Sequence, residues 1–124
     1  MKFINGDIYE GEFQDGIMNG YGILQKDHGK TVYEGEWKDG KMNGKGIYLW
    51  RDEDRFYKGE YVMDKKEGHG EYKFSDGRRY VGEWSNGKQH GIGFIIFPNG
   101  KISKSRYENG KKVENLEIDD EEIS

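Results

Sequence analysis

The stretch YEGEWKDGKMNGKGIYLW, residues 33–50, decides the fold of this chain. Tyr33, Gly35 and Trp37 lie two residues apart, so a β-strand would place all three on one face. The Asp-Gly pair that follows is suited to positive φ angles and hence to a tight hairpin turn. The second half again alternates glycine with large rings. The stretch therefore predicts a β-hairpin with one face on which bare backbone alternates with aromatic rings.

The same pattern occurs four times in succession, with a period of 23 or 24 residues. The units span 9–32, 33–56, 57–79 and 80–102, and partial units flank them at 3–8 and 103–111. All 20 glycines fall at repeat positions, which leaves none for a flexible linker. A ring can lie over a glycine of the neighbouring strand, and this explains why glycine, normally costly inside a strand, recurs there.

The repeated unit resembles the MORN repeat (membrane occupation and recognition nexus), whose core reads Y-x-G-x-W-x-x-G-x-x-x-G-x-G. The resemblance covers about residues 3–111. Unit two lacks the closing glycine, unit three has Asp64 in place of its turn glycine, and the last fragment has Ser103 where a tyrosine is expected. We therefore interpret that fragment as a cap. The resemblance implies a non-catalytic scaffold that receives partner helices or peptides in a groove, frequently in cytoskeletal or ciliary assemblies and in other cases at membranes.

We expect an all-β fold: a single-layer, elongated, twisted antiparallel meander of about four and a half β-hairpins, or about ten strands. The chain contains no alanine, the best helix former, which argues against a mainly helical protein. At roughly 4.8 Å per strand, the sheet would extend about 45 to 50 Å. Twist should curve it into an open trough.

The C-terminal stretch VENLEIDDEEIS differs in composition from the repeats. It carries six acids and no Lys or Arg. We therefore divide the chain into a repeat array, 1–112, and an acidic tail, 113–124. A disordered terminus and a short helix over the last sheet edge are both open for this tail, because an exposed sheet edge invites aggregation.

Composition excludes several classes of protein. No apolar run approaches the roughly 18 to 20 residues that span a bilayer, and the N-terminus lacks the features of a secretory signal. The chain has no cysteine, so it offers neither a disulfide framework nor a thiolate metal site. A pI of about 5.4 gives no support to nucleic-acid binding. We expect a cytoplasmic protein, and the resemblance implies a cytoskeletal or ciliary association.

The sequence offers no catalytic constellation. Its three histidines have no partner at metal-ligand spacing. Glutamates recur once per unit, at Glu12, Glu36, Glu60 and Glu83. A catalytic carboxylate pair should be unique, so these side chains are better explained by cross-strand pairing or backbone hydrogen bonds. We expect no enzymatic activity, no cofactor, no metal and no small-molecule substrate.

The aromatic face is the predicted partner-binding site, because a single-layer sheet has no second sheet to cover its rings. We expect it to hold an amphipathic helix or an extended segment of another protein, although any one ring taken by itself is better explained as core. The predicted partner-binding rings are Tyr33, Trp37, Tyr48, Trp50, Tyr57, Tyr61, Tyr72, Tyr80 and Trp84.

The alternative is a peripheral membrane module that binds anionic phospholipids through the basic C-terminal half. A net charge of −4 and the acidic tail weaken this alternative. The candidate lipid-binding residues are Lys65, Lys66, Arg78, Arg79, Lys88, Lys101, Lys104 and Arg106.

Overall fold

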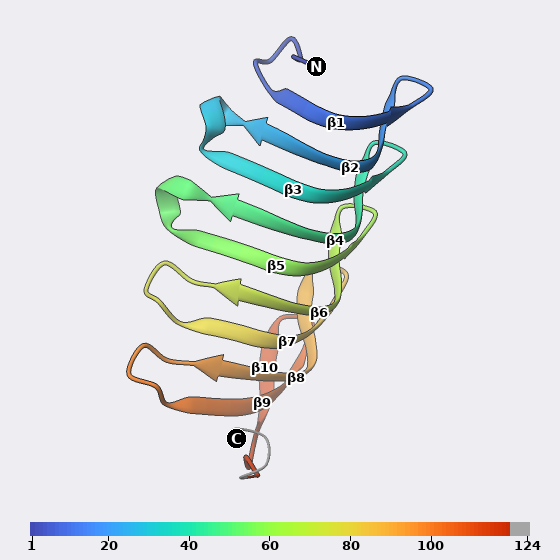
Figure 1. Ribbon diagram of the computed structural model, residues 1–124. Helices are drawn as coiled ribbons and strands as arrows, with labels where there is room; N and C mark the ends of the chain where they lie inside the picture. The colour runs from blue at the N-terminus through green and yellow to red at the C-terminus, as the bar shows by residue number, and fades with distance from the viewer. Residues whose placement is uncertain (120–124) are drawn as a thin grey trace.

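The computed structural model describes residues 1–119 and shows one open antiparallel sheet in which strand order follows chain order (Figure 1). Two 3₁₀ turns, at Asp27–Gly29 and Arg51–Glu53, connect successive hairpins. The predicted all-β, single-layer meander of about ten strands is confirmed. The strands are β1 (Ile8–Gln14), β2 (Ile17–Lys26), β3 (Thr31–Lys38), β4 (Lys41–Trp50), β5 (Arg55–Val62), β6 (Lys65–Lys73), β7 (Arg79–Ser85), β8 (Lys88–Ile96), β9 (Ile102–Glu108) and β10 (Lys111–Leu116).

The last strand runs past the predicted end of the array. β10 continues to Leu116, so the division between 112 and 113 falls inside a strand. Residues 113–116 therefore belong to the sheet, and neither a disordered tail nor a short helix describes them. Residues 120–124, the end of the predicted tail, lie outside the described residues.

The tight turns take the backbone shape that their sequences predict. Asp39 and Gly40 both have positive φ angles, 52° and 79°. Asp64, which replaces glycine in the third unit, has a φ of 71°. Aspartate enters the left-handed region more readily than most residues, so the hairpin keeps its turn without the glycine.

A row of paired glycines crosses the sheet and accommodates the tyrosines. In the second unit, Gly35 pairs with Gly46, and a Cβ added to Gly46 would lie 2.3 Å from the Tyr33 hydroxyl and 2.5 Å from its ring. The Tyr33 hydroxyl donates to the carbonyl of Glu36 at 2.9 Å, which fixes the ring over the bare backbone. The row comprises Gly11, Gly22, Gly35, Gly46, Gly59, Gly70, Gly82 and Gly93.

Eight buried rings form a continuous ladder that replaces a conventional two-layer core. Successive centroids lie 5.0 to 5.5 Å apart and the ring planes are nearly perpendicular, an arrangement that aromatic quadrupoles favour. Trp37, Tyr61 and Trp84 each lie between the tyrosine of their own unit and that of the unit before, and Tyr107 packs on Tyr80 at the end of the ladder. In order, this ring ladder is Tyr9, Trp37, Tyr33, Tyr61, Tyr57, Trp84, Tyr80 and Tyr107.

The pattern changes where the ladder ends. Ser103 occupies the tyrosine position of the last hairpin, and its two glycine-row positions hold Ser105 and Asn115, which pair across β9 and β10. With no ring to cover, these positions tolerate side chains. The Ser105 hydroxyl, which is buried, donates to the Asn115 side chain at 3.5 Å.

The glycine row leads to a first prediction. Gly46→Ala should lower the free energy of unfolding by about 3 kcal/mol, because overpacking a site whose neighbours cannot move costs this much. Gly16→Ala is the control: nothing lies within 4 Å of its added Cβ, and φ is +78°. Only the left-handed backbone penalty applies to it, about 1 kcal/mol. Urea denaturation followed by tryptophan fluorescence compares them, and equal losses would contradict the steric explanation.

Candidate interaction site

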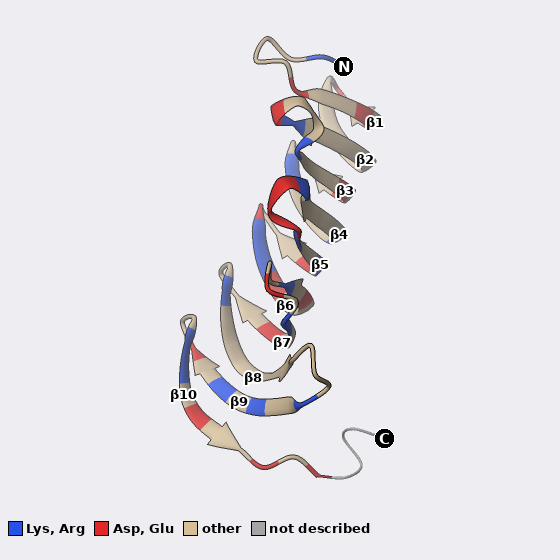
Figure 2. Cartoon of the chain, turned by 90° about the vertical axis from the view of Figure 1, so that its left-hand side faces the viewer, with Lys and Arg blue, Asp and Glu red and all other residues tan. Residues whose placement is uncertain are grey.

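The two faces of this single layer differ. We call the face that carries the ring ladder the tyrosine face and the other one the opposite face. The tight turns bend toward the preceding hairpin, as shown by the Gly40 N–H, which donates to the Met18 carbonyl at 2.9 Å, and by the Gly87 N–H, which donates to Lys66 at 2.9 Å. Seen from the side, the sheet is bent, and the turns of its last hairpins project from one side of it (Figure 2).

The structure divides the nine predicted partner-binding rings into two groups. Six are buried in the ring ladder, where their first role is to hold the sheet together: Tyr33, Trp37, Tyr57, Tyr61, Tyr80 and Trp84. Tyr48, Trp50 and Tyr72 are half-buried and pack on the ladder from outside. They are the predicted rings that remain accessible.

A hollow of about 330 Å³ opens on the tyrosine face over the first two repeats. We call it the trough. The ladder residues Tyr33 and Trp37 contribute to its lining, and so does Gly40 from a tight turn. The rest of its apolar lining is half-buried and consists of Met18, Leu24, Met42 and Tyr48. Sequence reasoning missed Met18, Leu24 and Met42, although the recurrence of methionine at one repeat position was a signal.

In the third repeat a lysine stands where the first two have methionine. Lys66 pairs with Tyr61, as Met42 pairs with Trp37 and Met18 with Phe13. The Lys66 ammonium lies 5.4 to 5.8 Å from four ring centroids. These rings belong to Trp50, Tyr57, Tyr72 and Trp84. Burial, and then the charge of Arg55, lower the pKa of the Lys66 side chain.

Arg55 adds a second cation to the same rings. Its guanidinium lies 4.7 Å from the Trp50 centroid and 6.0 Å from that of Tyr72. It donates to the Tyr72 hydroxyl and forms an ion pair with Glu53. The trough itself is also lined by Lys26, Thr31 and Asp64, and the tyrosine face beside it becomes cationic at the third repeat.

The position of Lys66 leads to a second prediction. Lys66→Met should raise the free energy of unfolding by about 1 kcal/mol, because methionine keeps the stem in contact with the rings and removes a partly desolvated charge. The chain already carries methionine at this position in two repeats. Thermal unfolding measures the change, with the exposed Lys65→Met as control. A destabilised Lys66→Met variant would show that the cation–ring contacts outweigh desolvation.

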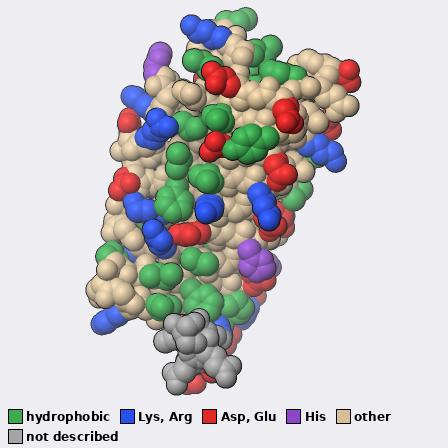
Figure 3. All heavy atoms as spheres, viewed as in Figure 1, with side chains coloured by type: hydrophobic (Ala, Val, Ile, Leu, Met, Phe, Trp, Pro, Cys, Tyr) green, Lys and Arg blue, Asp and Glu red, His purple; other side chains and the backbone are tan. Residues whose placement is uncertain are grey.

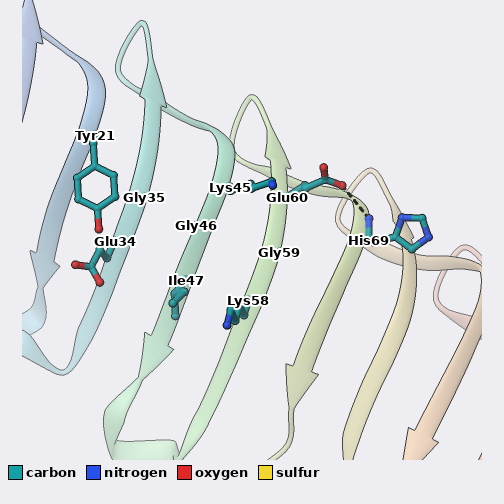
Figure 4. A pocket seen from close by; sticks show the side chains of 10 residues that line it. All are labelled: Tyr21, Glu34, Gly35, Lys45, Gly46, Ile47, Lys58, Gly59, Glu60 and His69. Atoms are coloured by element: carbon teal, nitrogen blue, oxygen red, sulfur yellow. Dashed lines mark hydrogen bonds between the residues drawn. The ribbon is translucent and has the colours of Figure 1, made fainter. Parts of the chain in front are cut away.

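A shallower groove of about 540 Å³ crosses the opposite face. Its floor is the glycine row, and side chains of both charges flank it, among them Glu34, Lys45 and Lys58 (Figure 4). In Figure 4 the Glu60 carboxylate accepts the backbone N–H of His69, at 3.1 Å. The whole face mixes apolar and charged groups without a single-sign area (Figure 3).

The recurring glutamates are structural, as their repetition predicted. Each one accepts the backbone N–H of the residue nine positions later, which satisfies the irregular backbone after the positive-φ glycine of its hairpin. The four pairs are Glu12 with Tyr21, Glu36 with Lys45, Glu60 with His69 and Glu83 with Ile92.

The predicted lipid-binding residues do not form one surface. Lys66 lies on the rings of the tyrosine face, whereas Arg79 pairs with Glu71 at 3.2 Å and Arg106 with Glu108 at 2.8 Å. Arg78 pairs with Asp76, Lys104 lies 5.9 Å from the Phe94 centroid, and Lys101 is exposed in a loop. Lys65 and Lys88 are exposed beside tight turns, at the starts of β6 and β8.

Within residues 1–119, no group of three or more His, Asp or Glu side chains is arranged to hold a metal ion. His90 accepts the Asn109 N–H through Nδ1 at 3.4 Å, as part of a turn. None of the described helices has the length and apolarity to cross a bilayer.

Comparison with known proteins identifies the repeat. The family model of the MORN repeat matches residues 9–30, 33–55, 57–78 and 80–102, well over half of the chain. No curated protein matches the chain. The four matched segments coincide with hairpins of the sheet, and MORN repeats in general are non-enzymatic modules that interact with proteins or membrane lipids. The chain therefore belongs to the MORN-repeat family.

Proposed function

We propose that this protein is a non-catalytic interaction scaffold whose trough holds an amphipathic helix or an extended segment of a partner protein. The observation that carries this proposal is the half-buried apolar lining of the trough. Met18, Leu24, Met42 and Tyr48 pack on the ladder with one side and leave the other side open. The setting that the family suggests for such a scaffold is a small subunit of a cytoskeletal or ciliary assembly.

The lining suits an apolar helix face. Methionine is unbranched and adapts to irregular partners, and helices dock into apolar grooves through residues at i, i+3, i+4 and i+7. The trough is also curved by the turns at its rim, so it offers a concave surface. A partner on the opposite face would desolvate Glu34, Lys45, Lys58 and Glu60, more charges than Lys26 and Asp64 bring to the trough.

A pair of glutamate substitutions tests the proposal. Partners captured by the full chain are identified by mass spectrometry, and their binding to two variants is then measured. Met42→Glu places a charge in the trough, whereas Ile47→Glu places one on the opposite face from the same strand. We expect Met42→Glu to weaken binding by about tenfold or more and Ile47→Glu to leave it nearly unchanged. If only Ile47→Glu loses partner binding while both variants remain folded, the partner binds the opposite face and the proposal is wrong.

A second candidate function rests on a row of lysines along the turn rim. The residue that begins the second strand is exposed lysine in four successive hairpins: Lys41, Lys65, Lys88 and Lys111. Such a row could approach an anionic membrane, where each charge contributes about 1 kcal/mol. Co-sedimentation with vesicles containing about 30% phosphatidylserine tests it. Binding that is lost in Lys65→Glu/Lys88→Glu would support the membrane function, and no binding at low salt would remove it.

A further inference from the structure

We propose that the tyrosine face selects an acidic partner: Lys66, held on Trp50 and Tyr72 next to the trough, is the receptor for one carboxylate of the segment that the trough binds. This inference rests on the proposed function and assigns the chemistry of the occupant. The segment would place apolar side chains over the first two repeats and an Asp or Glu over the third.

Comparison of the repeats shows that the lysine is a departure from their common pattern. Met18 and Met42 occupy one position of the first two units, and Lys66 occupies the same position of the third. A methionine there would fill the space equally well. A lysine in contact with four rings adds a charge beside the trough, where Arg55 also lies on Trp50 but is already paired with Glu53.

Lys66 is half-buried, and no anionic group neutralises it within the described part of the chain. Among the ion pairs of residues 1–119, none involves Lys66. Asp64 also lines the trough, but its carboxylate accepts the Met42 N–H at 2.8 Å. Only ring faces offset the lost hydration of the ammonium. A carboxylate that arrives from the open side would form a charge-assisted hydrogen bond in a partly dry setting, where such bonds are strongest.

The geometry also fixes the spacing within the partner. Lys66 pairs through Tyr61 with Gly44, so Met42 lies two strand spacings and two residues away from it, or about 12 Å. In a helix laid along the trough, 12 Å is seven to eight residues, or about two turns, which keeps both side chains toward the sheet. The occupant would thus carry an apolar residue and an acidic one about seven or eight positions apart.

Two synthetic peptides test the inference. Both are helical, about 18 residues long, with leucines at i, i+3, i+4 and i+7 and either glutamates or glutamines in the last turn. We expect the wild-type chain to bind the glutamate peptide about tenfold more tightly than its twin. Lys66→Met should bind both peptides equally, and the rim variant Lys88→Met should keep the tenfold preference. Calorimetry or fluorescence anisotropy gives the dissociation constants.

The outcomes separate this inference from the proposed function. Equal, measurable affinities of the wild type for both peptides would overturn the carboxylate receptor and leave a trough that accepts helices. Binding of neither peptide would contradict both the receptor and a helical occupant. A tenfold preference that persists in Lys66→Met would overturn the role of Lys66. If that variant instead loses binding to phosphatidylserine vesicles while the peptides show no preference, the site binds phosphate and the inference is wrong.

Discussion

Raising the pH above about 10 is expected to unfold this protein cooperatively. Burial raises the pKa of the Tyr33, Tyr57, Tyr61 and Tyr80 phenols above the ordinary value. The unfolded chain therefore loses these protons first. The stabilisation from keeping the phenols neutral is complete below about pH 10 and is lost as the pH rises toward the folded-state pKa. Above pH 10, each phenol lowers the free energy of unfolding by about 1.4 kcal/mol per pH unit, so the four together lower it by about 5 kcal/mol per pH unit.

The measurement follows tyrosinate absorbance and tryptophan fluorescence together as the pH rises. We expect the two signals to change at one midpoint, because ionisation of the buried phenols requires unfolding. Tyr61→Phe removes one phenol from the ladder and should shift the midpoint to higher pH, whereas Tyr21→Phe, at an exposed position, should shift it less. Ionisation of all nine tyrosines with unchanged tryptophan fluorescence would contradict the prediction.

Trp84→Ala is expected to lower the free energy of unfolding by about 4 kcal/mol, the usual cost of truncating a buried tryptophan. Trp84 is 8% exposed and joins Tyr57 to Tyr80 in the ladder. Its indole N–H also donates to the carbonyl of Gly70 at 3.1 Å, so the truncation leaves this carbonyl without its side-chain donor.

The first hairpin supplies the matched control. Phe13 occupies the repeat position of Trp84, but it is 43% exposed and packs on Tyr9 at the end of the array. Phe13→Ala should therefore cost about 1 kcal/mol, in line with its smaller buried area. Chemical denaturation gives both values. Equal costs at the two positions would mean that the ladder does not couple neighbouring units.

The interaction site was predicted less completely than the fold. Strand alternation correctly placed the rings on one face, yet it treated Trp37 and Tyr48 as equivalent. Trp37 lies between the tyrosines of two units and is buried, whereas Tyr48 packs on the outside of Tyr33. The face on which a side chain lies follows from the two-residue period of a strand. Its exposed fraction depends instead on which rings of the neighbouring units cover it.

The sequence by itself determined the repeat, the strands, the turns and the reason for the glycines. All of these depend on local backbone preferences and on side chains that recur at fixed spacing. Tertiary structure alone decided that the rings of the ladder are buried, that Met18 and Met42 line the trough, and that Lys66 lies on four rings. These features are set by the stacking of units in space, because one residue is covered or exposed by side chains from other repeats, at distances that sequence spacing does not encode.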